Sequence, residues 1–421
     1  MKHIYTSVDI GTDSTKVVVT ELYKGKLNLL AASSIKSNGI KKGLITDVDE
    51  ASRTLKSAIN EVEEMLGISI KKVLVNVPSY FADFVKVEGE IRVNSENSVI
   101  DGRHISKVIE TAIKNSNFSK EVVTVTPIDF SVDEQSGISD PKGLMGDILK
   151  VRAVVSLVPK KNIYSVISVL SGAGLDVVDI TVSGLADYYQ VRTPKLDKKI
   201  GAIINLGHET TNVSIFNNGK IMNTETIQLG GVNIENDIAY VFGTNIVDAR
   251  KIKEKFAVCN KRFTNLNDTY ELVNNVGDTV KLNQFEVSEV VQSRMSEILK
   301  LAKKQITLLT KKDIDYIVIT GGLTEIKSFK NLVYEILGKD VIIYLMDEIG
   351  IRDNKYTTAM GMIKAFHDKM KVRGKEYSLV SQEDCEILLT PNINNNINRK
   401  EKTGVSKIFK GFIRNKEEKY E

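Results

Sequence analysis

Two short polar turns with the composition of phosphate-binding loops occur 196 residues apart in the sequence. VDIGTDSTKVVV (residues 8–19) and INLGHETTNVSI (residues 204–215) each begin as an apolar strand, turn at glycine and polar residues, and resume as a strand. Glycine lets main-chain N–H groups converge on an anion, and hydroxyl side chains add hydrogen-bond donors. Each block alone also fits an ordinary β-hairpin, but the recurrence of the pattern favours two loops that clamp a phosphate chain.

The two blocks correspond residue by residue at their polar positions. The matched pairs are Asp9 with Asn205, Gly11 with Gly207, Ser14 with Thr210, and Thr15 with Thr211. Lys16 adds a positive point charge suited to a phosphate. Asp9, at the end of its strand, is suited to hold Mg²⁺ through water.

Two glycine pairs extend this pattern. Residues 314–326 read as a buried strand that ends in Gly321 and Gly322, followed by an amphipathic helix to about residue 337. Gly230 and Gly231 precede a second helical segment. Glycines at the end of a strand are common where a ligand approaches an α/β sheet, so we expect both pairs near the same ligand.

The surrounding elements place each polar turn inside an antiparallel meander. Each block is followed by a second turn, YKGKLNLL in the first half and NNGKIMNT in the second, and Asn218-Gly219 is a strong hairpin signal. A chain of 421 residues with 42% hydrophobic content is expected to form two to four folded units.

Charge and cysteine content exclude several classes of function. Lys and Arg number 58 and Asp and Glu 54, and residues 390–421 alone carry the whole net charge of +4, which does not suggest a nucleic-acid-binding protein. The two cysteines indicate neither a disulfide framework nor a zinc site. No signal peptide and no apolar run long enough to span a bilayer is evident, so we expect a cytosolic protein.

The last part of the chain combines a polar, Asn-rich segment with an amphipathic pattern. The Asn-rich segment covers residues 390–402 and is followed by GVSKIFKGFIRN (residues 404–415), where Thr403 can cap a helix. Its apolar residues fall on one helical arc of about 140° and its basic residues on the opposite side; they are Val405, Ile408, Phe409, Phe412 and Ile413, against Lys407, Lys410 and Arg414. Such a helix is predicted to lie on an anionic membrane, with docking on its own protein or in a partner groove as the alternative.

These blocks together resemble the actin/Hsp70/sugar-kinase superfamily, and within it the FtsA family of actin-like bacterial cell-division proteins. Residues 43–67 resemble that family's first helix, residues 287–306 its long helix in the second half, and residues 358–366 its closing helix. Residues 127–159 resemble its inserted subdomain, and the characteristic positions there are Asp140, Pro141, Gly143 and Gly146. An actin-like pilus-assembly protein of similar layout is the alternative.

The resemblance implies an α/β, actin-like (ribonuclease-H-like) two-lobed ATPase fold with an inserted α+β subdomain and a C-terminal amphipathic helix. The expected units are residues 1–80 with 160–196 as the first actin-like subdomain, 81–159 as the insert, 197–371 as the second half with an outer helical lobe at about 242–309, 372–402 as a flexible linker, and 403–416 as the membrane-targeting helix.

The resemblance also implies that ATP and Mg²⁺ bind between the halves. The expected ATP-binding residues are Asp9, Gly11, Thr12, Ser14, Thr15, Lys16, Asn205, Gly207, Thr210, Thr211, Gly230, Gly231, Lys253, Gly321, Gly322 and Leu323. Asn205 and Ser183 stand where hydrolysing relatives carry water-orienting Asp and Gln or Glu, so we expect at most a weak ATPase. Arg250 stands where the family often has Glu, which leaves its role open.

The partners implied by the resemblance are those of a division-ring adaptor. Arg294 is expected to bind the C-terminal peptide of the tubulin-like ring protein FtsZ, and a solvated helix charge is the alternative. The protein is expected to self-associate as an actin-like filament, to bind anionic lipid at the cytoplasmic face of the membrane at the division septum, and to recruit downstream division proteins. An ATP-hydrolysing pilus-assembly function is the alternative. A small-molecule kinase is disfavoured because no carboxylate base is evident.

Overall fold

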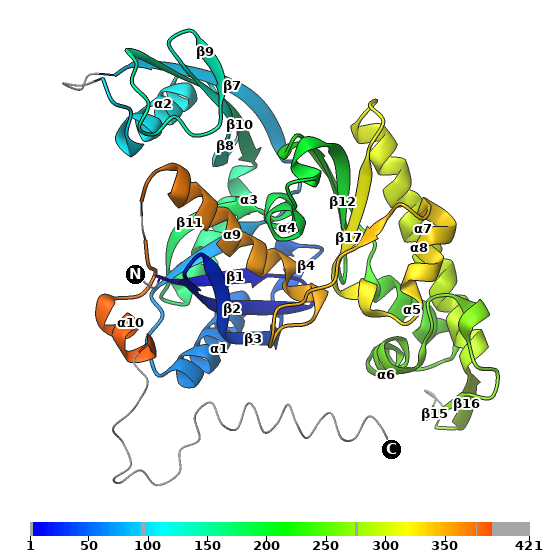
Figure 1. Cartoon of the computed structure of the whole chain (residues 1–421). Helices are drawn as coiled ribbons and strands as arrows, with labels where there is room; N and C mark the ends of the chain where they lie inside the picture. Colours follow the sequence, from blue (N-terminus) through cyan, green and yellow to red (C-terminus); the bar gives the residue numbers. More distant parts are fainter. Residues whose placement is uncertain (1–2, 94–97, 274–276, 376, 390–421) are drawn as a thin grey trace, which may run out of the picture.

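The first half of the chain is built on a five-stranded sheet with the strand order β11-β6-β1-β2-β3 (Figure 1). The computed structural model describes residues 3–93, 98–273, 277–375 and 377–389. The strands are β1 (His3–Ile10), β2 (Ser14–Tyr23), β3 (Lys26–Lys36), β6 (Lys72–Val77) and β11 (Asp176–Val182). β1, β2 and β3 are antiparallel, whereas β6 and β11 run parallel to β1. The predicted meander at the start of this half is therefore confirmed.

The second half repeats this arrangement in a sheet with the order β14-β13-β12-β17-β18. Its strands are β12 (Ile200–Leu206), β13 (Thr211–Asn217), β14 (Lys220–Ile227), β17 (Tyr316–Thr320) and β18 (Ile342–Ile343). β12, β13 and β14 form an antiparallel meander, and β17 and β18 add in parallel. Asn218 and Gly219, with φ values of 48° and 72°, form the predicted hairpin turn between β13 and β14.

Helices cover both sheets, and one helix pair lies between them. α1 (Val48–Leu66) and α3 (Lys160–Gly172) pack on the outer side of the first sheet. α4 (Ser183–Val191) and α9 (Thr357–Val372) pack on each other, and α4 also contacts strands of both sheets (Figure 1). The apolar face of α1 explains its place, because its residues Leu55, Ala58 and Val62 recur at helical spacing and are fully buried.

A separate sheet between β6 and α3 forms an α+β insert with the order β7-β10-β8-β9. It consists of β7 (Asp83–Arg92), α2 (Gly102–Lys114), β8 (Glu121–Val132), β9 (Gln135–Ile138) and β10 (Ile148–Val158). Every strand pairing in it is antiparallel. α2 packs on β7 and β10, and its buried residues Ile105, Val108 and Ala112 join the insert's own core.

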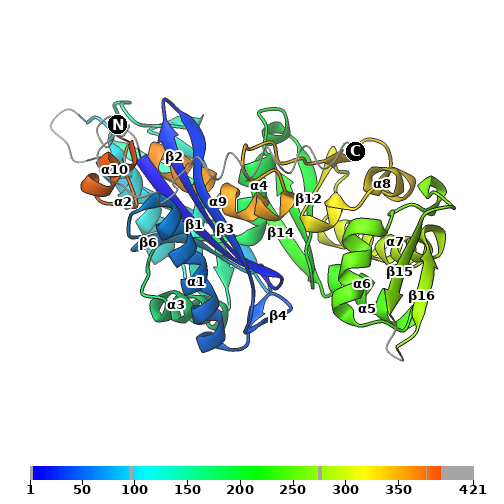
Figure 2. The ribbon, with the colours of Figure 1, turned by 90° about the horizontal axis from the view of Figure 1, so that it is seen from below.

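The outer lobe of the second half is mainly helical and also contains a hairpin. Its elements are α5 (Gly231–Val241), α6 (Ile246–Lys251), η2 (Ile252–Phe256), η3 (Lys261–Phe263), β15 (Thr269–Val273), β16 (Thr279–Asn283) and α7 (Gln284–Leu309). α8 (Phe329–Leu337) packs against α7. Figure 2 shows the two halves side by side, with α6 on the side of the outer lobe that faces the first half and the β15–β16 hairpin at the end away from it.

The segment after α9 differs from the predicted flexible linker at residues 372–402. The Leu379 N–H donates a 2.8 Å hydrogen bond to the Ile4 carbonyl, so this segment lies beside the start of β1. It leads into α10 (Gln382–Leu389), from which Cys385 and Leu388 pack against the core of the first half. The prediction missed this docking because the helix is short and its apolar residues are few.

The predicted membrane-targeting helix at residues 403–416 lies outside the described residues. Among the helices of residues 3–93, 98–273, 277–375 and 377–389, none is long and apolar enough to cross a membrane.

Candidate functional site

A cleft between the two halves brings most of the predicted residues together. It encloses a cavity of about 430 Å³, which is within the size range of small-molecule sites. Its walls come from the β1–β2 turn, the β12–β13 turn, the start of α4, and η4 (Gly322–Glu325) after β17. The predicted residues that line it are Asp9, Gly11, Thr12, Ser14, Lys16, Ser183, Asn205, Gly207, Thr210, Gly231, Lys253, Gly321, Gly322 and Leu323.

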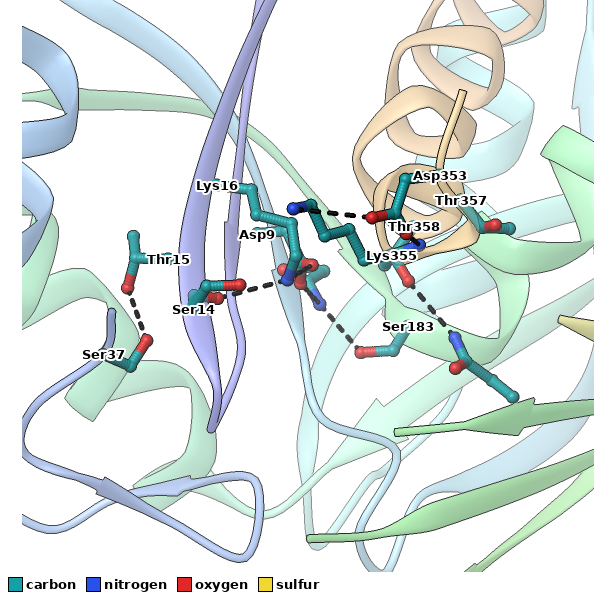
Figure 3. A network of polar contacts seen from close by, with 12 residues as sticks. Asp9, Ser14, Thr15, Lys16, Ser37, Ser183, Asp353, Lys355, Thr357 and Thr358 are labelled. Atoms are coloured by element: carbon teal, nitrogen blue, oxygen red, sulfur yellow. Dashed lines mark hydrogen bonds and ion pairs between the residues drawn. The ribbon is translucent and has the colours of Figure 1, made fainter. Parts of the chain in front are cut away.

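The first turn presents a buried charge pair to the cavity (Figure 3). Asp9 and Lys16 are register partners on β1 and β2, and their side chains form an ion pair of 3.1 Å. Lys16 also donates to the Ser14 carbonyl at 3.1 Å, and Asn76 at the end of β6 donates to Asp9 at 3.1 Å. Both oxygens of Asp9 are therefore held in place, one by an ammonium group and one by an amide.

Ser183 is part of the same network but is too short to reach across the cavity. Its hydroxyl donates to the Val77 carbonyl at 2.9 Å and accepts from Asn76 at 2.9 Å. The hydroxyl is therefore used to join α4 to the end of β6, which is a structural role.

The second turn carries an amide where the first carries a carboxylate. Asn205 lies at the end of β12, and its Nδ2 donates to Asp187 of α4 at 2.8 Å. Thr358 at the start of α9 donates to the other oxygen of Asp187 at 2.6 Å. The pKa of Asp187 is raised to about 7 as the net result of burial, which raises it most, the hydrogen bonds from Thr358 and Asn205, which lower it, and the charge of Asp9, which raises it.

Two predicted phosphate-binding hydroxyls point away from the cavity. The hydroxyl of Thr15 lies 3.0 Å from that of Ser37, and Thr211 donates to the Leu229 carbonyl at 2.9 Å. Both threonines are fully buried. The alternation of side chains along a strand explains this, because Ser14 and Thr210, one residue earlier, line the cavity instead.

Gly321 and Gly230 are needed because other parts of the backbone pass close to them, and not because a ligand does. A Cβ at Gly321, where φ is +98°, would lie 2.4 Å from the Leu206 carbonyl oxygen and 2.5 Å from Asn205 Oδ1. A Cβ at Gly230, which does not line the cavity, would lie 2.6 Å from backbone oxygens of the second turn. A Cβ at Gly322 meets nothing within 4 Å, so of the pair after β17 this is the residue with free space beside it.

An ion pair connects the first turn to the outer lobe. Arg250 of α6 donates from Nη1 and Nη2 to the two carboxylate oxygens of Asp13, at 2.6 and 3.0 Å. Burial alone would raise the pKa of Asp13, but the hydrogen bonds and charge of Arg250 outweigh it and lower the pKa below its usual 3.8. Arg250, whose role the sequence left open, is therefore the cationic half of a contact across the cleft.

A second contact across the cleft lies at the β4–β5 hairpin. β4 (Ile40–Lys41) and β5 (Leu44–Ile45) flank Lys42, whose backbone N–H donates to the carboxylate of Glu209 in the second turn. The Lys42 ammonium donates to the side-chain oxygen of Gln228 at 2.9 Å. The cleft is thus bridged at both polar turns.

The far wall of the cavity carries two more lysines. Lys253 forms a buried ion pair with Glu235 of α5, and His208 lies 3.7 Å from the same carboxylate. Lys355, in η5 (Asn354–Tyr356), lines the cavity and lies 3.5 Å from Asp353 (Figure 3). With Lys16 and Arg250, these groups make a cavity whose cations suit a polyphosphate.

Arg294 lies away from this cavity, on α7 of the outer lobe. It donates to both oxygens of Asp237 on α5, at 2.6 and 3.0 Å, and also pairs with Glu297. A groove beside Glu297 is lined by residues of α7 and by Lys261. Arg294 is therefore neither a freely solvated charge nor part of the nucleotide-sized cavity.

Sequence reasoning missed several residues that complete the site. Asn76 could have been found, because β6 runs parallel to β1 and the ends of parallel strands meet at one edge of a sheet. Asp13 lies inside the first turn, but nothing local indicates that its partner is Arg250. Asp187 and Lys355 carry no motif of their own.

Family models match two parts of the chain. Residues 202–361 match the model described as cell division protein FtsA, and residues 82–156 match the SHS2 domain inserted in FtsA. The second match coincides with the insert formed by β7, α2, β8, β9 and β10.

Relatives and solved structures agree with these matches. The chain is 30% identical to cell division protein FtsA of Streptococcus pneumoniae, over 85% of this chain and 79% of that protein, and 28% identical to that of Bacillus subtilis, over 91% and 88%. Among solved structures, a PilM–PilN type IV pilus biogenesis complex matches with a TM-score of 0.56 and 15% identity, over 85% of this chain and 97% of that one. MreB5 of Spiroplasma citri bound to ADP matches with 0.53 and 14%, over 88% and 97%. The actin-like fold is thereby confirmed.

Proposed function

Because this chain belongs to the FtsA family of cell-division proteins, we propose that it is an ATP-binding adaptor that ties the division ring to the membrane. In this role it binds ATP with Mg²⁺, self-associates as an actin-like filament, holds FtsZ at the inner face of the cytoplasmic membrane at the septum, and recruits later division proteins. The residues of the cleft support the first part of this proposal, and the sequence of the tail supports the membrane part.

The cleft fits a nucleoside triphosphate in size and charge. Lys16, Arg250, Lys253 and Lys355 bring cationic groups to the cavity from four different elements, and the two polar turns face it from opposite halves. In this structure each of these cations is paired with a carboxylate, Asp9, Asp13, Glu235 or Asp353, so they would bind the phosphate chain of ATP by sharing or exchanging these contacts. Asp9 is the carboxylate at the end of β1 that is suited to hold the waters of Mg²⁺.

The same residues support slow turnover. Asn205 and Ser183 occupy the water-orienting positions, and both are engaged in hydrogen bonds with the protein, to Asp187 and to the Val77 carbonyl. An amide and a short hydroxyl cannot take a proton from water as a carboxylate can. We therefore propose a nucleotide-dependent switch with at most weak ATPase activity.

Arg294 and the adjoining groove of α7 are the proposed site for the FtsZ C-terminal peptide. Lys261, Lys300 and Lys304 line the groove together with Glu289 and Glu297. Lys261 is paired with Glu289, so Lys300 and Lys304 are the lysines that would attract an acidic peptide. The nearby Arg294–Asp237 pair gives the site a fixed cation at its edge.

The tail is proposed to bind anionic lipid as an amphipathic helix. Fully burying one large apolar side chain contributes roughly 1.5–3 kcal/mol, and each basic residue near an anionic surface adds about 1 kcal/mol. Ordering the segment costs roughly 1 kcal/mol or more per residue, so one tail binds reversibly. Several tails on one filament bind far more tightly, because each later contact is intramolecular.

The alternative, an ATP-hydrolysing pilus-assembly protein, has less support. The pilus-complex match is at 15% identity and speaks for the fold, whereas both family models and the curated relatives are FtsA.

Sedimentation with FtsZ and anionic vesicles tests the proposal. With ATP, the protein should carry FtsZ polymers into the vesicle pellet, and phosphate release should stay below about 1 s⁻¹, the low end of ordinary enzyme turnover. Phe409→Glu/Phe412→Glu should leave FtsZ binding intact and abolish the vesicle pellet. Vesicle binding that survives the double substitution would return the tail to a partner-binding helix, and fast phosphate release would favour the pilus-type alternative.

A further inference from the structure

Asp187 is a buried carboxylate that the proposed nucleotide site does not itself touch. It lies in the second turn of α4 with 1% of its surface exposed, and it is absent from the ion pairs found among the described residues. A carboxylate without a cation is costly to bury, so its partners must explain why it is tolerated. Those partners are Asn205 and Thr358, and both line the cavity.

The geometry around Asp187 fixes the orientation of the Asn205 amide. An ionised carboxylate only accepts hydrogen bonds, so the NH₂ group of Asn205 must face Asp187, which it does at 2.8 Å. The carbonyl oxygen Oδ1 then faces the opposite way, toward Gly321, whose Cβ position would lie 2.5 Å from it. Gly321 is itself part of the cavity wall, so Asn205 presents an acceptor on the cavity side.

We propose that Asp187 is a positioning residue that selects which face of the Asn205 amide is presented to the phosphate end of the cleft. The proposal rests on the proposed binding of ATP there. With Asp187 ionised, the amide offers its carbonyl, which can accept a hydrogen bond from water but repels a phosphate oxygen. With Asp187 protonated on Oδ2, the oxygen that faces Asn205, its O–H donates to the amide, which turns, accepts with Oδ1, and offers its NH₂ group to the terminal phosphate. A proton on Oδ1 would instead donate to the Thr358 hydroxyl and leave the amide in place, and the measurements below distinguish the two.

The surroundings of Asp187 allow both states near neutral pH. The groups that face it are Thr358 from α9, Asn205 from β12 and, at longer range, the carboxylate of Asp9 from β1. Its pKa is raised to about 7 as the net of burial, which is the largest cause, the lowering by the Thr358 and Asn205 hydrogen bonds, and the raising by the Asp9 charge. Asn205, which stands where the superfamily has Asp, lines the cavity, and Asp187 contacts it from the side away from the cavity. The site therefore keeps a carboxylate, but one that does not line the cavity.

Nuclear magnetic resonance on ¹⁵N-asparagine-labelled protein tests the orientation without any nucleotide. The side-chain NH₂ pair of Asn205 is identified as the pair missing in Asn205→Ser. In the wild type it should shift with a midpoint near pH 7, and in the isosteric Asp187→Asn variant it should not titrate. Thr358→Val removes one hydrogen bond to the ionised form and should move the midpoint upward.

A nucleotide measurement then tests the consequence. Wild-type preference for ATP over ADP should rise about tenfold from pH 8 to pH 6, the value of one hydrogen bond to a charged group. Asp187→Asn should show no such rise, and comparison with it removes the titration of the nucleotide itself. An Asn205 signal that titrates in neither protein, or equally in both, overturns the inference. A wild type that titrates but does not bind ATP would instead refute the proposed function and leave the positioning role standing.

Discussion

Arg250 and Asp13 form a two-bond ion pair that joins the outer lobe to the first polar turn, with their side chains 35% and 32% exposed. The pair crosses the cleft at the cavity wall, so it restrains the two halves against moving apart there. A planar guanidinium with two parallel bonds holds this geometry better than a lysine would.

Breaking this pair should speed nucleotide exchange. Because both side chains are about a third exposed, the pair is worth about 1 kcal/mol, which corresponds to roughly fivefold in rate. Release of a fluorescent ATP analogue from Arg250→Ala, measured by stopped flow, should be faster by about that factor. Arg262→Ala, which breaks a 3.3 Å pair with Glu335 inside the second half, is the matched control. Equal release rates in the two variants would show that the cross-cleft pair does not restrain exchange.

The two glycines after β17 should respond differently to the same substitution. Gly322→Val places its side chain in free space at the cavity wall, so it should weaken ATP affinity and leave the melting temperature nearly unchanged. Gly321→Val must clash with the Leu206 backbone at a positive φ, so it should destabilise the protein by about 1–3 kcal/mol. Calorimetric titration and thermal unfolding measure both effects. Unchanged ATP affinity in Gly322→Val would place the nucleotide elsewhere.

Placing a carboxylate at residue 205 should by itself lower the free energy of unfolding. Asn205→Asp sets a second carboxylate against Asp187, and like charges sharing a site raise one pKa strongly. An acid whose pKa is raised in the folded state holds a proton that the unfolded chain has lost. The free energy of unfolding therefore falls as the pH rises from about 4, where a carboxylate of the unfolded chain titrates, to the raised pKa. At pH 8 the loss relative to the wild type should be on the order of 2 kcal/mol.

The exchanged pair Asn205→Asp/Asp187→Asn is the control for this prediction. It keeps one carboxylate and one amide in the same two places, so its unfolding free energy at pH 8 should return close to that of the wild type. Chemical denaturation at pH 6 and pH 8 makes the comparison. If the single variant were as stable as the wild type at pH 8, Asp187 would not be ionised there.

Arg294 should contribute to peptide binding by its charge. Arg294→Glu should weaken the affinity for an acidic FtsZ tail peptide about tenfold or more and leave ATP affinity unchanged. Since the substitution also sets a carboxylate against Asp237, Asp237→Asn is the control, because it removes the ion pair with Asp237 and keeps the cation, which still has Glu297 as a partner. Fluorescence anisotropy of a labelled peptide reports both. Weaker binding in Asp237→Asn as well would mean that the α5–α7 contact, and not the charge, matters.

The sequence predicted the parts of this molecule that are encoded locally and repeated. The two meanders, their polar turns and the glycine pair after β17 follow from strand patterns and turn residues that recur in both halves. The partners of isolated charges could not be predicted, because Asp13 and Arg250 are 237 residues apart and Asp187 and Thr358 are 171 apart. Thr15 and Thr211 were predicted to bind phosphate, but the side chains of a strand alternate and theirs point away from the cavity. The docking of α10 was not predicted, because its sequence has no helical periodicity of apolar residues.

The docking of Leu379 and α10 on the first half also fixes the place from which the chain beyond residue 389 starts. In both views α10 and the outer lobe lie at opposite ends (Figures 1 and 2). The 13 residues from 390 to 402 span at most about 45 Å when fully extended, so residue 403 stays tethered within that radius of the α10 end. If the proposed membrane helix binds lipid, the α10 end of the first half would stay within about that distance of the bilayer, while the rest of the molecule could take more than one orientation on this tether.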